Sequence, residues 1–134
     1  MKTLRHIFTL ITTILLVSVA LSSCIEDSFT DSPSDQPTFS TDTVRLGNLF
    51  TLDASPTQLF LVYNRHNKGL NISRIAFADD PAGHFRLNVD GMSGREFNNV
   101  EIRQQDSIFI FVEATLPENG RNMAVDLISH IEFQ

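Results

Sequence analysis

The sequence predicts an all-β domain, an antiparallel sandwich or barrel, over residues 43–134. Three observations predict it. Apolar residues recur at every second position in short runs, which is the period of a strand with one buried face. Clusters of Asp, Asn, Gly and Pro separate the runs, which begin 11 to 17 residues apart; short runs divided by turn residues are typical of antiparallel all-β folds. No window of 11 residues has the apolar spacing of a helix.

The runs differ in how many of their faces are apolar. In the first run, Leu59, Leu61 and Tyr63 alternate with the equally apolar Phe60 and Val62. We therefore expect this strand to be central and packed on both sides, or covered by a loop. The later runs, in order, are Leu70, Ile72, Ile75 and Phe77; Phe85, Leu87 and Val89; Phe97, Val100 and Ile102; Ile108, Ile110, Val112 and Ala114; and Val125, Leu127, Ile128, Ile131 and Phe133.

The run that begins at Leu70 changes phase, because its apolar positions shift by one residue between Ile72 and Ile75. A one-residue shift within a strand predicts a β-bulge, here near Arg74. Turn-forming residues separate the runs and predict the connections between strands. These turn segments are Asn67-Lys68-Gly69, Asp79-Asp80-Pro81-Ala82-Gly83, Asp90-Gly91 and Pro117-Glu118-Asn119-Gly120.

The N-terminus has the pattern of a lipoprotein signal peptide over residues 1–23. Two bases, Lys2 and Arg5, precede a stretch of 15 residues, 7–21, in which 11 are apolar and none is charged. A bilayer-spanning helix needs about 20 apolar residues, so this length is typical of a secretory signal. The stretch ends in Leu21-Ser22-Ser23-Cys24, which resembles the bacterial lipobox. The resemblance implies cleavage before Cys24, a diacylglyceryl group on its sulfur and an acylated amino terminus.

Cys24 is the single cysteine of the chain, so an internal disulfide and a cysteine zinc site are excluded. Two or more acyl chains, such as palmitate, are enough for stable anchoring without a spanning helix. We expect an outer-membrane protein that is anchored by lipid. The acidic Glu26 and Asp27 resemble the surface-export signal of Bacteroidetes lipoproteins, which implies exposure at the cell surface.

Residues 24–42 are predicted to be an acidic, flexible tether. From residue 25 to residue 42 there are five acidic residues and no Lys or Arg. Pro33 and Pro37 interrupt any regular pattern. Low hydrophobicity, like charges and proline favour an extended spacer between the membrane and the domain.

Five segments of the predicted domain form an ordered pattern: Phe39-Ser40-Thr41-Asp42-Thr43-Val44, Val62-Tyr63-Asn64, Leu70-Asn71-Ile72-Ser73, Phe85-Arg86-Leu87-Asn88-Val89-Asp90-Gly91 and Asp106-Ser107-Ile108-Phe109-Ile110-Phe111-Val112-Glu113. This pattern resembles the N-terminal immunoglobulin-like domain of Bacteroidetes lipoproteins that continue into a parallel β-helix. It is similar, more loosely, to immunoglobulin-like domains of the ASPM/SPD-2/Hydin type. The resemblance implies an immunoglobulin-like sandwich and no catalytic motif. Because the longer members continue with a further hairpin, we expect a sandwich that lacks its last strand or strands, with an unpaired edge near Ile131 and Phe133.

Few residues of the sequence have the spacing of a catalytic or metal site. His66, His84 and His130 are far apart in sequence, so no histidine pair has metal-ligand spacing. The acidic residues Asp79, Asp80 and Asp90 could contribute oxygen ligands to calcium, but acidic turn residues are common and we assign no metal or other cofactor. No nucleophile elbow or phosphate-binding loop is present in the sequence. The net charge of −6 argues against nucleic acid as a partner.

Two short motifs are candidates for modification. Asp42-Thr43-Val44 and Asp106-Ser107-Ile108 resemble the Asp-Ser/Thr-aliphatic motif of Bacteroidetes O-glycosylation, which implies glycans on Thr43 and Ser107. The alternative is that each Asp and hydroxyl caps a turn at the start of a strand.

The sequence thus favours a non-enzymatic, lipid-anchored module for binding, adhesion or spacing. Its partners would be the membrane, through the lipid, and a protein or polysaccharide that the sequence does not identify. The alternative is the truncated anchor domain of a longer, polysaccharide-associated β-helix protein.

Overall fold

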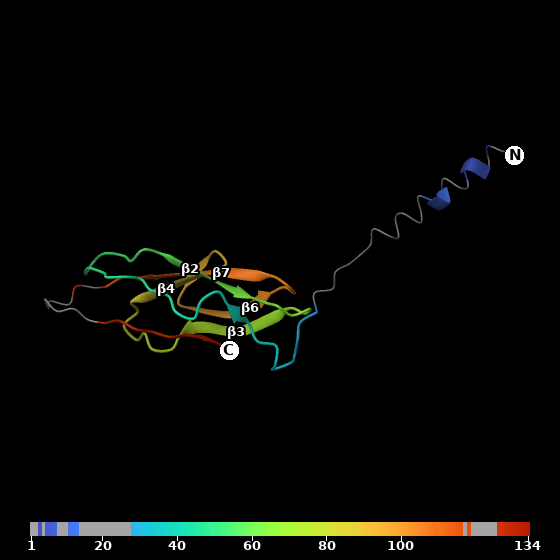
Figure 1. Ribbon diagram of the computed structural model, residues 1–134. Coiled ribbons are helices and arrows are strands. Elements are labelled where there is room, and N and C mark those ends of the chain that lie inside the picture. The colour runs from blue at the N-terminus through green and yellow to red at the C-terminus, as the bar shows by residue number, and fades with distance from the viewer. Residues whose placement is uncertain (1–2, 4, 8–10, 14–27, 117, 119–125) are drawn as a thin grey trace.

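The computed structural model describes residues 3, 5–7, 11–13, 28–116, 118 and 126–134 (Figure 1). Its eight strands form two antiparallel sheets that pack face to face. The predicted all-β sandwich is confirmed, and within the described ranges both sheets are open, so the barrel alternative is wrong.

The larger sheet has five strands in the order β1-β2-β7-β4-β5, and the smaller sheet has the order β6-β3-β8. The chain passes between the sheets after β2, β3, β5, β6 and β7. The strands are β1 (Thr38–Phe39), β2 (Gln58–Tyr63), β3 (Leu70–Phe77), β4 (Phe85–Val89), β5 (Met92–Gly94), β6 (Glu96–Ile102), β7 (Ser107–Ala114) and β8 (Ile131–Phe133).

The core lies between the sheets and is built from the alternating apolar positions of the sequence. On β7, Ile108, Ile110 and Val112 point inward, and Val62 of β2 and Ile75 of β3 are fully buried. Burial of each large aliphatic side chain contributes about 1.5–3 kcal/mol to folding. The period of two therefore fixes which face of each strand meets the other sheet.

The phase change in β3 is a β-bulge, as predicted. The backbone N–H groups of Ser73 and Arg74 both donate to the carbonyl oxygen of Gln134, at 2.6 and 3.3 Å. Two successive residues thus face one residue of the β8 side, which is the definition of a bulge. On the other side of β3, the register with β6 is the same before and after this point, and only Ser73 and Asn99, which has a φ of 54°, are left out of the ladder.

The Asp90-Gly91 turn joins β4 to β5 with two residues. Both residues have positive φ, 48° and 87°, as the tight hairpin turn that matches strand twist requires. The side-chain oxygen of Asn88 accepts the N–H of Gly91 at 2.9 Å. This bond fixes the orientation of Asn88 on the outer face of the sheet.

The predicted tether boundary at residue 42 is wrong for residues 28–42. Thr38–Phe39 pairs with β2, and the Thr30 N–H donates to the Gly69 carbonyl at 2.9 Å. Two aromatic residues explain the difference. The ring of Phe39 lies 4.8 Å from that of Phe133, and Phe29 packs where a Cβ on Gly69 would approach its ring to 2.8 Å. The average composition of the predicted tether is polar, so it does not indicate that Phe29 and Phe39 pack against the sandwich.

Cys24 lies outside the described residues, as does most of the predicted signal peptide. Most of the predicted turn at residues 117–120 also lies outside them. The described N-terminal residues 3, 5–7 and 11–13 are helical. In the described part of the chain, no helix has the length and apolar character needed to cross a bilayer.

Candidate functional site

The outer face of the five-stranded sheet carries an apolar surface that the sandwich core does not use. On β2 and β7 the outward positions are Leu59, Leu61, Tyr63, Phe109 and Phe111, which we name the outer-face patch. Leu59 lies opposite Phe111, and Leu61 lies opposite Phe109. Leu59 is 51% exposed and Phe109 is 38% exposed. The expectation that β2 is covered on both sides is therefore wrong at Leu59.

The two aromatic rings of the patch support each other. The rings of Phe109 and Phe111 lie 5.5 Å apart at 64°, an edge-to-face arrangement that stabilises aromatic pairs. At the end of the same row, the Arg65 guanidinium lies 4.5 Å above the ring of Tyr63. Apolar patches with a polar rim often mark binding surfaces, so the patch is the first candidate site.

A groove of about 320 Å³ lies beside Phe111. It crosses the sheet where Phe111 of β7, Asn88 of β4 and Ser93 of β5 stand in one cross-strand row. Glu113 extends the groove along β7. We name this the Phe111 groove; its lining residues are Thr57, Leu87, Asn88, Ser93, Phe111 and Glu113.

A second hollow, of about 250 Å³, lies at the loop end of β2 and β7. Ser107, one of the two predicted glycosylation sites, lines it with Tyr63 and Arg65. Ser107 is half-buried and its N–H bonds the side chain of Asp106 at 2.7 Å, the turn arrangement named above as the alternative. Thr43, the other predicted site, is exposed in the loop after β1. Its hydroxyl is thus the more accessible of the two.

Asn64, beside this hollow, is buried and binds three carbonyls. Its amide nitrogen donates to the oxygens of Lys68, Arg103 and Ile102 at 2.7, 2.9 and 3.1 Å. Its amide oxygen accepts the N–H of His66 at 2.9 Å. These bonds join the loop after β2 to the end of β6, so the role of Asn64 is structural.

Asp80 is the most buried carboxylate among the described residues, with its side chain 2% exposed. Its oxygens accept the N–H groups of His84 at 2.9 Å and Phe85 at 3.0 Å, and Nη2 of Arg95 at 2.9 Å. Burial raises the pKa of Asp80, but the bonds from Phe85 and His84 and the charge of Arg95 lower that pKa by more. Gly83 has a φ of +74°, a backbone conformation that favours glycine, and a Cβ there would lie 2.9 Å from the Arg95 guanidinium.

The neighbouring carboxylate, Asp79, is exposed and bonds the residues that precede β8. It accepts the Ser129 hydroxyl at 2.8 Å and the His130 N–H at 2.7 Å, while His130 Nδ1 lies 2.9 Å from its second oxygen. The bonds from the His130 side chain and N–H and from Ser129 lower the pKa of Asp79 to about 2. Ser129 binds the carboxylate instead of the imidazole, so the three do not form a nucleophilic triad.

The remaining polar candidates also have separate partners. His66 lies 3.5 Å from Asp35, and His84 lies 3.6 Å from Asp80. His66 and His84 are half-buried, whereas His130 is exposed. In residues 28–116 and the other described positions, no three His, Cys, Asp or Glu side chains gather where they could hold a metal ion.

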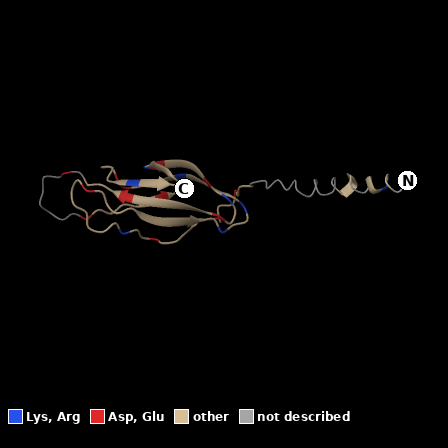
Figure 2. Cartoon of the chain, turned by 90° about the horizontal axis from the view of Figure 1, so that it is seen from above, with Lys and Arg blue, Asp and Glu red and all other residues tan. Residues whose placement is uncertain are grey.

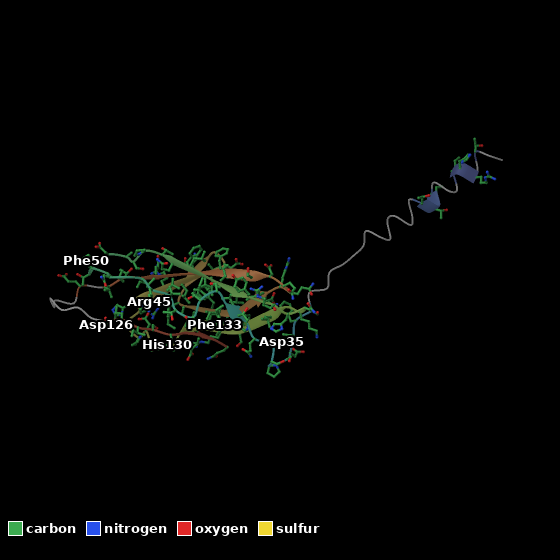
Figure 3. The ribbon with its side chains drawn as sticks, in the orientation of Figure 1. Asp35, Arg45, Phe50, Asp126, His130 and Phe133 are labelled. Carbon is green, nitrogen blue, oxygen red and sulfur yellow. The ribbon has the colours of Figure 1, made fainter. Side chains whose placement is uncertain are left out.

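The charged residues are spread over the sandwich, with acidic and basic positions at both of its ends (Figure 2). Figure 3 places Phe50 at one end of the sandwich and Asp35 at the other. The described chain enters the sandwich at the Asp35 end, through residues 28–37.

No family profile matches the chain, and no curated protein or solved structure matches it.

Proposed function

We propose that the protein is a non-enzymatic, lipid-anchored β-sandwich module, held at the outer membrane or cell surface by Cys24, that binds a partner through the outer face of its five-stranded sheet. Binding, adhesion and spacing from the membrane are the activities that such a module performs. The observation that carries the proposal is the outer-face patch together with the Phe111 groove.

The pairing of the strands supports an immunoglobulin-like classification. In that fold the second strand pairs with strand E in one sheet, and strand C pairs with strand F in the other. Here β2 pairs with β7 in the larger sheet, and β3 pairs with β8 in the smaller one. β4 pairs with β7 as strand D pairs with strand E, and β5 and β6 are inserted between β4 and β7. We propose an immunoglobulin-like sandwich with this insertion.

Asp79 and Asp80 stabilise the fold, whereas the outer-face patch does not, and this contrast supports a binding function for the patch. Asp80 closes the loop between β3 and β4, and Asp79 fastens β8 to that loop. The outer-face patch has no such role, because its side chains point away from the core. Apolar side chains that do not stabilise the fold by burial are available to a partner.

A second candidate function is the anchor domain of a longer, polysaccharide-associated β-helix protein. The placement of β8 favours it, because β8 is an edge strand of the smaller sheet as far as the structure describes the chain. An edge strand offers free backbone groups to an added strand. The gene sequence downstream of the codon for Gln134 discriminates the two functions, since a continuing β-helix reading frame favours the anchor domain.

The binding proposal is tested with the full chain, affinity-tagged and exposed to intact cells of the source organism. The double variant Leu59→Thr and Phe109→Thr removes apolar surface and keeps residues that favour strands. We expect it to recover at least tenfold less partner than the wild type. The matched control, Asn71→Thr with Asn98→Thr, changes exposed positions of the smaller sheet and should recover as much as the wild type. Equal recovery by both variants would contradict the proposal.

A further inference from the structure

We propose that the Phe111 groove is a saccharide subsite that holds one pyranose unit of a neutral oligosaccharide, a proposal that rests on the binding function above and names its ligand class. The groove combines one aromatic face with amide, hydroxyl and carboxylate groups around it. A pyranose ring presents an apolar face of C–H bonds and a rim of hydroxyls, so both parts of the groove have a counterpart on the sugar.

The aromatic part is Phe111, whose ring is half-buried and held from the side by Phe109 at 5.5 Å. An aromatic face carries partial negative charge and attracts the polarised C–H bonds of a sugar. Because Phe109 restricts the ring, little side-chain entropy is lost when a ligand stacks on it. Leu59, opposite Phe111 on β2, continues the apolar floor toward a neighbouring sugar unit.

The polar part is fixed in place by bonds within the β4–β5 hairpin. Asn88 accepts the Gly91 N–H at 2.9 Å and donates to the Ser93 hydroxyl oxygen at 3.2 Å. Ser93 acts as an acceptor in that bond, so its own proton is directed to another acceptor, which a sugar hydroxyl supplies. The second N–H of the Asn88 amide is a further donor. A site whose donors are already oriented binds with a smaller ordering cost.

Glu113 supplies the acceptor on the other side. It stands two residues from Phe111 on the same face of β7, and Thr57 lines the groove with it. A carboxylate accepts up to two hydroxyl bonds in a bidentate geometry, and bonds to an ionised acceptor are stronger than neutral ones. The six lining residues include this one acid and no base. The lining therefore offers no cation to an acidic saccharide, which makes the neutral class the preferred one.

The size of the groove agrees with a single ring. A volume of about 320 Å³ is at the lower limit of small-molecule sites, which run from about 300 to 1,000 Å³. One ring on an open groove binds weakly, and a dissociation constant on the order of 1 mM is expected from the contact that so few atoms can make. Longer oligosaccharides gain from contact with Leu59 beyond the groove.

The test is isothermal titration of the detergent-purified full chain with three neutral hexasaccharides, cellohexaose, chitohexaose and maltohexaose, and with the acidic hexagalacturonate. We expect at least one neutral hexasaccharide to bind with a dissociation constant of about 1 mM or below, and hexagalacturonate to bind at least tenfold more weakly. Phe111→Ala should weaken neutral binding at least tenfold. Ser93→Val, at an exposed edge position, should weaken it at least threefold without changing the core.

Two further variants make the result specific. Glu113→Gln removes the negative charge of the lining, so the dissociation constant for hexagalacturonate should move closer to that for the neutral hexasaccharide. Asn71→Thr, at an exposed position of β3 in the smaller sheet, should bind neutral sugar like the wild type. No binding to any of the three neutral sugars overturns the proposal, as does binding that neither Phe111→Ala nor Ser93→Val weakens. If the partner recovered from cells depends on Leu59 and Phe109 while the sugars fail to bind, the saccharide proposal falls and the binding function stands.

Discussion

Replacement of Asp80 by asparagine tests whether its buried carboxylate holds the loop between β3 and β4. The variant keeps the shape of the side chain but removes its charge and one acceptor. The carboxylate accepts two backbone N–H groups and one arm of Arg95. Hydrogen bonds to an ionised group contribute about 1.5–3 kcal/mol each, and they are not additive. Arg95 is half exposed, so water replaces part of its lost bond to Asp80. We therefore expect a net loss of about 2–4 kcal/mol in the free energy of unfolding.

That loss is measurable by urea denaturation at pH 7 and by a melting temperature that falls by about 10 °C or more. The matched control is Asp90→Asn, an exposed turn residue with positive φ, where asparagine is equally suited. The control should stay within about 0.5 kcal/mol of the wild type. A change below about 0.5 kcal/mol in Asp80→Asn would refute the structural role of the carboxylate.

The pH dependence provides a second check on the same variant. The pKa of Asp80 lies below its ordinary value in the folded chain, so its contribution to stability is present above the unfolded pKa, about 4. That contribution is lost as the pH falls through the folded pKa. The gap between wild type and Asp80→Asn should therefore be largest near neutral pH and shrink below about pH 4. A gap that stays constant down to pH 2.5 would contradict the assigned cause.

Three further predictions concern other parts of the chain. Cys24→Ser should move the protein from the membrane fraction to the soluble fraction and abolish labelling by a fatty-acid probe; a variant that still partitions with membranes and still labels shows that the lipobox interpretation is wrong. In the native host, the intact mass should exceed peptide plus lipid by a glycan on Thr43 or Ser107, and a mass without that excess excludes both. Asn64→Ala should lower the free energy of unfolding by about 2–4 kcal/mol in urea titration, since it leaves buried carbonyls without a donor; a loss below about 0.5 kcal/mol would contradict that role.

The sequence predicts the strands well because their signal is local. Alternation and turn residues identify β2, β4 and β7 and the Asp90-Gly91 turn, and the phase change near Arg74 marks a bulge. The N-terminal boundary fails for a physical reason: Phe29 and Phe39 make contacts with Gly69 and Phe133, far away in sequence. Local composition carries no information on such contacts.

The candidate site is harder to predict, because it depends on which strands are neighbours. The sequence shows that β2 and β7 each have a second apolar face, but it does not show that this face is exposed. The groove requires Asn88, Ser93 and Phe111 to stand in one row, which the β4–β7 and β4–β5 registers decide. No spacing in the sequence gives these registers. The patterning of residues 107–113, with aromatics between aliphatics, is the signal that could have indicated the patch.

The most direct measurement of binding by the five-stranded sheet is photo-crosslinking from its outer face in intact cells of the source organism. p-Benzoylphenylalanine, which inserts into C–H bonds of protein and saccharide alike, replaces Phe109 on the outer-face patch. The control carries it at Asn71, an exposed position of β3 in the smaller sheet. On illumination, we expect a discrete higher-mass adduct from Phe109→p-benzoylphenylalanine and none from the Asn71 control. Adducts of equal yield from both positions, or an adduct from Asn71 alone, would contradict a binding site on the five-stranded sheet.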